Sequence, residues 1–324
     1  MTNETVASGR LLRPVDAASL AVFRIVFGVA VAIDAWRYLA YGWVREYYIA
    51  PAIHFPHVDV AWLRPWPGEG MIFHYVAVSA LALSVAAGLW YRTTALLLAL
   101  AYGWAFLLEK SVYMNHHYLM VLLAFLLAVL PAQRALSVDV WRGVVARAQV
   151  PFLAVALLRF QLAIVYLYGA VAKLNPDWLA GEPMLSSLRD GGPEIPSLAH
   201  LLPAELLATF IAWAGIAVDV AIPVLLLRRS TVGWGIALAV AFHALNGVFL
   251  RIGVFSWLMI GAVTIFLPPD WPRRWLGSVG RVGAALPPRR WWIAWAAGYA
   301  FVQLVVALRH GAYPGDVGGT EEGH

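Results

Sequence analysis

Three polar side chains lie at equal spacing in and just after the apolar segment 150–172. Arg159, Tyr166 and Lys173 are each seven residues apart, which is nearly two turns of an α-helix, so they share one helix face. Such a face is unfavourable against lipid, and we predict that it borders a polar cavity. Spacing alone leaves two readings of Lys173 open, a functional residue and a cation that snorkels at a helix end. Arg159 is best explained as a structural partner of Asp34 or Asp219.

Two further polar groups open or close apolar segments. Asn115, His116 and His117 precede one segment, and His243 and Asn246 lie one helical turn apart in another. The second pair is typical of a hydrogen bond between helices, or of residues that line a site. The adjacent residues His116 and His117 point to different sides of a helix. We therefore expect no metal site, since no metal-ligand spacing is present.

The composition indicates what must position these residues. Hydrophobic residues make up 62% of the 324 residues and charged residues 13%, against about 25% charged in soluble domains. The absence of cysteine excludes thiolate nucleophiles and disulfides, and no basic stretch suggests nucleic acid. We predict an all-α polytopic transmembrane bundle with the bilayer as partner, forming one domain over 1–324. The nine expected spans are 18–41, 72–91, 93–109, 117–131, 150–172, 204–227, 232–250, 252–267 and 291–308.

The basic residues between these spans predict an orientation. With a cytoplasmic N-terminus, the arginine-rich loops that contain Arg134, Arg228 and Arg274 lie in the cytoplasm. In that arrangement His116, Lys173 and the pair His243 and Asn246 all fall at the outer end of the bundle. The loop 42–70 would cover the same end. We therefore expect a multi-pass plasma-membrane protein whose site faces outward.

Several ordered sequence blocks carry a family resemblance. They are LWYRTT at 89–94, LLEKSVYMNHHYL at 107–119, LLRFQLAIVYLYGAVAKLNPDWLAG at 157–181, FHALNGVFLRIGVF at 242–255, PPDWPRR at 268–274 and YPGDVGGTEEGH at 313–324. Together they make the chain resemble the vitamin K-dependent gamma-carboxylase family, whose shared part is the horizontally transferred transmembrane domain, in a short bacterial form.

The resemblance implies an activity and a set of site residues. In that family an enzyme oxidises reduced vitamin K with O2 to the epoxide, deprotonates glutamate and adds CO2. The catalytic lysine would be Lys173, made less basic by desolvation, and the active-site histidine would be His116. Asn115, His243, Asn246, Tyr166 and Arg159 would line the quinone site. The implied co-substrates are reduced vitamin K or menaquinol, O2 and CO2, with a lipid-soluble quinol and a glutamate-containing peptide or protein as partners.

The sequence departs from the family pattern in three places. Ala172 replaces a second lysine, and Asn175 replaces an acidic residue. The large outer C-terminal region of vertebrate members is expected to be absent or truncated after 310, which makes protein carboxylation less secure than quinol chemistry. A transporter and a non-catalytic membrane scaffold are the alternatives. The transporter would usually show inverted repeats, which we do not find, and a scaffold would not require Lys173, His116 and His243 at one depth.

Overall fold

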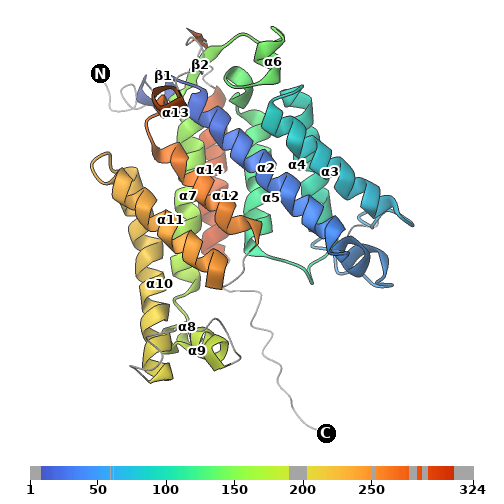
Figure 1. Ribbon diagram of the computed structural model, residues 1–324, viewed down its shortest axis with the longest axis vertical. Helices are drawn as coiled ribbons and strands as arrows, with labels where there is room; N and C mark the ends of the chain where they lie inside the picture. Colours follow the sequence, from blue (N-terminus) through green and yellow to red (C-terminus); the bar gives the residue numbers. More distant parts are fainter. Residues whose placement is uncertain are drawn as a thin grey trace. The chain divides into compact units, whose positions relative to one another are not determined.

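The computed structural model describes residues 9–58, 60, 62–189, 203–249, 253–276, 283–286 and 291–309. They form two units, and Figure 1 colours the chain by residue number, so that the segments of each unit can be located. One takes its residues from 1–159 and 239–288, and the other from 160–238 and 289–324. Helices α7 (Phe152–Ala172) and α11 (Val232–Phe249) run through the ranges of both.

The helices of the first unit follow the predicted apolar segments. α2 (Ala18–Ala40), α3 (Gly70–Ala87), α4 (Tyr91–Leu108) and α5 (Asn115–Val129) pack each against the next, and α12 (Val254–Ala262) packs on α2. Gly28 permits close approach of α2 and α3, because a Cβ there would lie 2.6 Å from the carbonyl oxygen of Ala82. The short elements are η1 (Arg45–Ile49), η2 (Ala132–Arg134), α6 (Val138–Trp141), η3 (Val263–Phe266) and α13 (Trp271–Leu276).

A small sheet, which the sequence did not predict, joins three distant parts of this unit. β1 (Pro14–Val15) is antiparallel to β2 (Ala148–Pro151), and β3 (Ala284–Ala285) is parallel to β2. Strands of two to four residues are too short to show an alternating hydrophobic pattern. The sheet is not a domain, and the helices dominate the fold.

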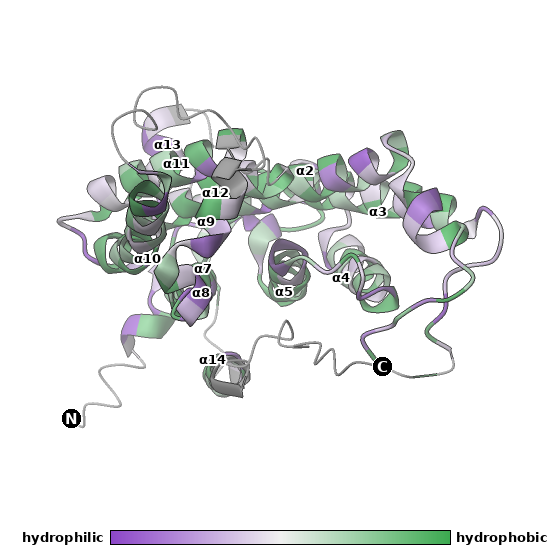
Figure 2. Cartoon of the chain, turned by 90° about the horizontal axis from the view of Figure 1, so that it is seen from below, coloured by the Kyte–Doolittle hydropathy of each residue, from purple (hydrophilic) through white to green (hydrophobic). Residues whose placement is uncertain are grey.

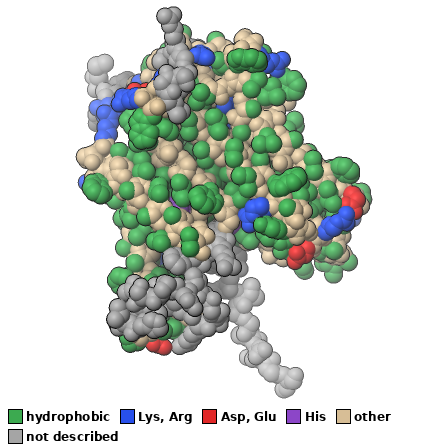
Figure 3. All heavy atoms as spheres, viewed as in Figure 1, with side chains coloured by type: hydrophobic (Ala, Val, Ile, Leu, Met, Phe, Trp, Pro, Cys, Tyr) green, Lys and Arg blue, Asp and Glu red, His purple; other side chains and the backbone are tan. Residues whose placement is uncertain are grey.

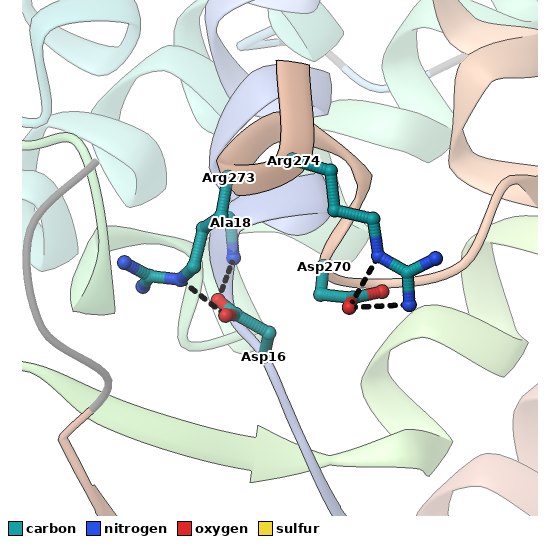
Figure 4. A network of polar contacts seen from close by, with 5 residues as sticks. All are labelled: Asp16, Ala18, Asp270, Arg273 and Arg274. Carbon is teal, nitrogen blue, oxygen red and sulfur yellow. Dashed lines mark hydrogen bonds and ion pairs between the residues drawn. The ribbon is translucent and has the colours of Figure 1, made fainter. Parts of the chain in front are cut away.

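An ionic network lies next to the sheet, where the chain enters α2 (Figure 4). One oxygen of Asp16 accepts the backbone N–H of Ala18 at 2.9 Å, and the other bonds Arg273 of α13. Asp270 and Arg274 form a second, more exposed pair one helical turn apart. The first pair therefore joins the start of α2 to α13.

The second unit contains α8 (Pro176–Ala180), α9 (Glu182–Arg189), α10 (Ala204–Leu227) and α14 (Trp291–Arg309), with parts of α7 and α11. α8 and α9 pack against each other and against α10. The hydroxyl of Tyr168 donates to the carbonyl oxygen of Gln303, which links α7 to α14. The hydroxyl of Tyr299 donates to the side chain of Gln161 and makes a second link.

The helices have the character of membrane spans. In the described part of the chain, each of the nine predicted segments contains a helix, and α2, α3, α4, α7 and α10 are long and apolar enough to cross a bilayer. The described apolar stretches are shorter, 10–17 residues, in α5, α11, α12 with η3, and α14, so nine crossings stay a prediction. Green, which marks hydrophobic residues, covers much of the helical ribbon in Figure 2 and much of the visible surface in Figure 3. Exposed side chains such as Phe73, Phe210 and Leu83 are therefore suited to lipid.

Candidate functional site

The chain turns sharply where Lys173 follows α7. Asn175 caps α8, because its side-chain oxygen accepts the N–H of Trp178 at 2.9 Å and its amide donates to the carbonyl of Ala172 at 2.9 Å. Pro176 takes the first helical position, where a missing N–H costs nothing. Gly181 ends α8 with φ +85° and lies so close to α10 that a Cβ would be 2.7 Å from the backbone nitrogen of Thr209. These local signals fix the position of Lys173.

Lys173 is held between a carboxylate and an aromatic ring. Its ammonium bonds Asp219 of α10, and it lies 5.3 Å from the centre of the Trp178 ring. Trp178 is itself fixed, because its indole N–H donates to the carbonyl oxygen of Ala212 at 3.2 Å. The side chain of Lys173 is 20% exposed and that of Asp219 5%. Lys173 therefore points into the second unit and does not extend freely as a snorkelling residue.

A glycine on α7 makes room for this carboxylate. A Cβ at Gly169 would lie 3.0 Å from an oxygen of Asp219, which is tighter than ordinary van der Waals contact. Tyr166, nearly one turn earlier on the same helix, is buried. The spacing of Gly169 and Lys173 therefore places the carboxylate against the last turn of α7.

Asp219 changes the electrostatics expected for the lysine. Desolvation disfavours an ammonium, whereas a neighbouring carboxylate favours it. The sequence alone predicts desolvation of Lys173 and makes Asp219 a candidate partner for Arg159. The structure instead pairs Asp219 with Lys173. Their 46-residue separation carries no local signal of this pairing.

Arg159 donates hydrogen bonds to backbone carbonyl groups at the end of η3. Its guanidinium donates to the carbonyl oxygens of Ile265 at 2.9 Å and Leu267 at 2.8 Å, and it lies 5.8 Å from the Phe266 ring. These bonds satisfy backbone acceptors that a helix end leaves open. Arg159 thus bonds backbone carbonyls, whereas the sequence made Asp34 or Asp219 its expected partner, and its place in a quinone site stays a prediction.

The first unit brings the predicted histidines around one phenylalanine. The ring of His116, the second residue of α5, stacks on Phe255 at 5.5 Å, and the ring of His243 meets Phe255 edge-on at 5.7 Å. Gly247 lets α11 approach α12 here, because a Cβ would lie 3.3 Å from Ser256. Asn246 is partly buried nearly one turn after His243. Asn115, the first residue of α5, precedes His116.

The neighbouring histidine belongs to a different polar cluster. His117 is buried, and its Nε2 lies 3.4 Å from Asp34 of α2. The hydroxyl of Tyr102 donates to the same carboxylate oxygen at 3.2 Å. A pocket of about 20 Å³ adjoins this cluster, lined by Asp34, Tyr38, Tyr48, Tyr75, Tyr102, Ala105, Phe106, Glu109, Val112, Tyr113 and His117. In the described residues, no three His, Asp or Glu side chains are arranged to hold a metal ion.

Part of the 42–70 loop is tied to the end of α4 through Glu109. Its carboxylate accepts the N–H groups of Ser111 at 3.0 Å and Phe55 at 3.3 Å, and it lies 3.2 Å from Nδ1 of His54. Burial raises the pKa of Glu109, but the hydrogen bonds from Ser111, Phe55 and His54 outweigh it and hold the pKa below its ordinary value. This part of the predicted cover therefore meets the pocket that contains His117.

A comparison with known families now bears on these sites. A family model described as HTTM domain matches residues 12–271. The chain belongs to the HTTM domain family. This is the domain of the vitamin K-dependent gamma-carboxylase family, so the resemblance drawn from the sequence blocks is confirmed. No solved structure gives a significant match.

The HTTM match contains the turn after α7 that holds Lys173, here called the lysine corner. It also contains the cluster of His116 and His243 around Phe255. The block 313–324 lies outside the match and outside the described residues. The geometry also explains one departure from the family pattern. Asn175 caps α8, and aspartate and asparagine cap helices equally well. An acidic residue at this position would therefore fulfil the same local role.

Sequence reasoning did not identify the acidic partners of Lys173 and His117 in this HTTM domain. Asp219 holds Lys173, and Asp34 holds His117. Both aspartates stand out as ionisable residues inside apolar segments, which signals a partner without naming it. Lys173 and Tyr166 belong to one unit and His116, His117 and His243 to the other, so the shared cavity expected for them stays a prediction.

Proposed function

We propose that this HTTM protein is a quinol-dependent membrane enzyme of the gamma-carboxylase type. It would oxidise reduced vitamin K or menaquinol with O2 to the epoxide. The same turnover would add CO2 to glutamate or another carbon acid. The observation that carries the proposal is the site of Lys173. Lys173 lies in the block AKLNPDW, and it is held by Trp178 of the same block and by Asp219 of α10. A lipid-soluble quinol suits such a site, because a water-poor pocket protects a strong base.

Lys173 would remove the first proton from the quinol. A hydroquinone hydroxyl resembles a phenol, with a pKa of about 10, and only the neutral amine can accept its proton. Asp219 is in contact with the Lys173 ammonium and can accept its proton. Burial penalises both charges, so this transfer would leave a neutral amine on Lys173 and a neutral carboxyl on Asp219. Neutral Lys173 then takes the quinol proton, and the quinolate is left for reaction with O2.

The other predicted residues would bind the quinol. His116, beside Asn115, would donate a hydrogen bond to the quinolate oxygen, and His243 and Asn246 would line the same pocket. Support comes from the common contact of His116 and His243 with Phe255, whose ring offers an aromatic surface beside both. Tyr166 is buried on α7, the helix that precedes Lys173, and it would line the site beside the lysine.

The proposal is tested by supplying the purified protein with reduced menaquinone or vitamin K under O2 and measuring epoxide by mass spectrometry. Lys173→Ala and Lys173→Arg should each lower epoxide formation by roughly 10²-fold or more, because neither side chain can be the base. The chain has one other lysine, Lys110, which is exposed. Lys110→Arg is therefore the matched control and should keep the wild-type rate.

Two results would contradict this assignment. Wild-type protein that forms no epoxide from either quinol would remove the proposed activity. Epoxide formation at the wild-type rate by Lys173→Arg would leave the activity standing and make Lys173 a structural cation, with His116 the next candidate for the base.

A further inference from the structure

Beside His116 lies an acid–base pair that the proposed reaction has not used. Asp34 and His117 are 4% and 9% exposed, respectively, and Nε2 of His117 lies 3.4 Å from Oδ2 of Asp34. A carboxylate facing an imidazole orients the ring and stabilises its protonated form. The His117 ring also meets the His116 ring edge-on, with 4.5 Å between centres. The pair is thus adjacent to a proposed quinol-binding residue.

Neighbouring groups fix the carboxylate and leave space for water. Tyr102 donates its hydroxyl to Oδ2 of Asp34 at 3.2 Å, and Arg37 lies 3.7 Å from the other oxygen. Both Asp34 and His117 line the pocket of about 20 Å³, which is sufficient for a water molecule. The pocket extends to Glu109, where it meets the loop segment bonded through Phe55.

The proposed reaction needs a route for a proton. Hydroquinone and O2 give epoxide and water, with the two quinol hydrogens leaving in the water. Replacement of a C–H hydrogen by CO2 gives a carboxylate and one proton. Each turnover therefore releases one proton, and a water-poor site cannot pass it directly to bulk solvent. A fixed chain of acid–base groups solves this problem.

We propose that His117 and Asp34 relay this proton from the His116 side of the site to water in the tyrosine-lined pocket. Nε2 of His117 passes a proton to Asp34, and Asp34 passes it to a pocket water, after which His117 takes the next proton. The relay rests on the proposed function, since that reaction supplies the proton. His117 and Asp34 would be positioning and relay residues that do not touch the quinol.

Several titratable or charged side chains surround His117. Among the described residues, these groups are Asp34, Arg37 and Tyr38 from α2, Tyr75 from α3, Tyr102 from α4 and His116 from α5, with Tyr48, Glu109 and Tyr113 also lining the pocket. Asp34 is the described carboxylate nearest to the imidazole. Removing its charge should therefore have the largest effect on His117.

The first experiment needs no quinol. In protein labelled with ¹⁵N-histidine, the His117 resonance is assigned by its loss in His117→Gln. The His117 imidazole should exchange its proton with solvent, and Asp34→Asn should slow that exchange several-fold, because the carboxylate that takes the proton from Nε2 is gone. Asp139→Asn is the matched control, since Asp139 is buried and caps the other end of α4. An imidazole proton that does not exchange with solvent, or whose exchange is insensitive to Asp34→Asn, would overturn the relay.

The second experiment measures epoxide formation. His117→Gly should lower the rate by roughly 10²-fold, and added imidazoles should restore it to a degree that follows their own pKa values. A wild-type rate in His117→Gly, or rescue independent of imidazole pKa, would overturn the relay while leaving the proposed function intact. If the wild-type protein forms no epoxide, the proposed function fails, and the proton-exchange measurement alone decides whether the acid–base pair exists.

Discussion

Arg24 shows how this protein accommodates a charged side chain among apolar helices. The side chain is 0% exposed, and its guanidinium donates to the carbonyl oxygens of Ala132 and Ala86 at 3.2 Å and Leu136 at 2.5 Å. These acceptors lie at the end of α3 and around η2, where helix ends leave carbonyls open. Arg24, like Arg159, is thus a connector for backbone groups.

Replacing Arg24 should be costly for this reason. Arg24→Lys keeps the charge but cannot reach three carbonyl groups with a fixed fork, and Arg24→Met leaves all three without their donor. We expect each to lower the free energy of unfolding by at least about 2 kcal/mol, measured by thermal unfolding in detergent. Arg147→Lys, at an exposed position, is the control. Equal midpoints for all three variants would contradict the connector role.

Two ion pairs near the start of α2 differ in how far they are buried. The Asp16 and Arg273 side chains are 7% and 17% exposed and join the start of α2 to α13. The Asp270 and Arg274 side chains are 41% and 62% exposed and lie within one turn. Figure 4 shows the two pairs side by side, which provides a natural comparison.

The two arginines should therefore differ in thermal unfolding. Arg273→Ala leaves the buried Asp16 carboxylate without its cation and should cost about 3 kcal/mol. Arg274→Ala removes an exposed pair and should cost less than about 1 kcal/mol. A larger loss in Arg274→Ala than in Arg273→Ala would be incompatible with α2 being held to α13 through Asp16.

The contact between the 42–70 loop and the end of α4 should make the stability of the fold depend on pH, because it is formed through Glu109. Its folded pKa lies below the ordinary value of 4.5, so the folded state binds the proton more weakly than the unfolded state. The resulting stabilisation is complete above the unfolded pKa and is lost as pH falls through the lower folded pKa. Wild-type protein should unfold at a higher temperature than Glu109→Gln near about pH 7, with the difference shrinking toward about pH 3. A difference that stays constant would exclude this linkage.

At the scale of the whole molecule, the distribution of arginines predicts an orientation in the membrane. The sequence lacks cysteine, so single cysteines report one position each. Asp177→Cys follows Lys173, Arg274→Cys lies in α13, and both positions are exposed. In intact cells a membrane-impermeant thiol reagent should label Asp177→Cys and leave Arg274→Cys unlabelled until the membrane is opened. The reverse pattern would turn the protein over and place the lysine corner in the cytoplasm.

The sequence by itself determined the features that arise from local interactions. Apolar stretches placed helices in all nine predicted segments of the described chain, because a bilayer requires long runs of apolar residues with internally bonded backbone. The order Asn175, Pro176 and Gly181 determined the corner after Lys173, because caps and turns act within a few residues. The ordered blocks also identified the family.

Only the tertiary structure decided which polar side chains meet. Asp219 pairs with Lys173, although the sequence made Asp219 and Asp34 candidate partners of Arg159, and Asp34 faces His117. Ion pairs between helices depend on which faces pack together and on small residues such as Gly169 that leave room for a carboxylate. Packing between segments distant in the chain has no local sequence period, so the charges that control the candidate site become visible only in the folded protein.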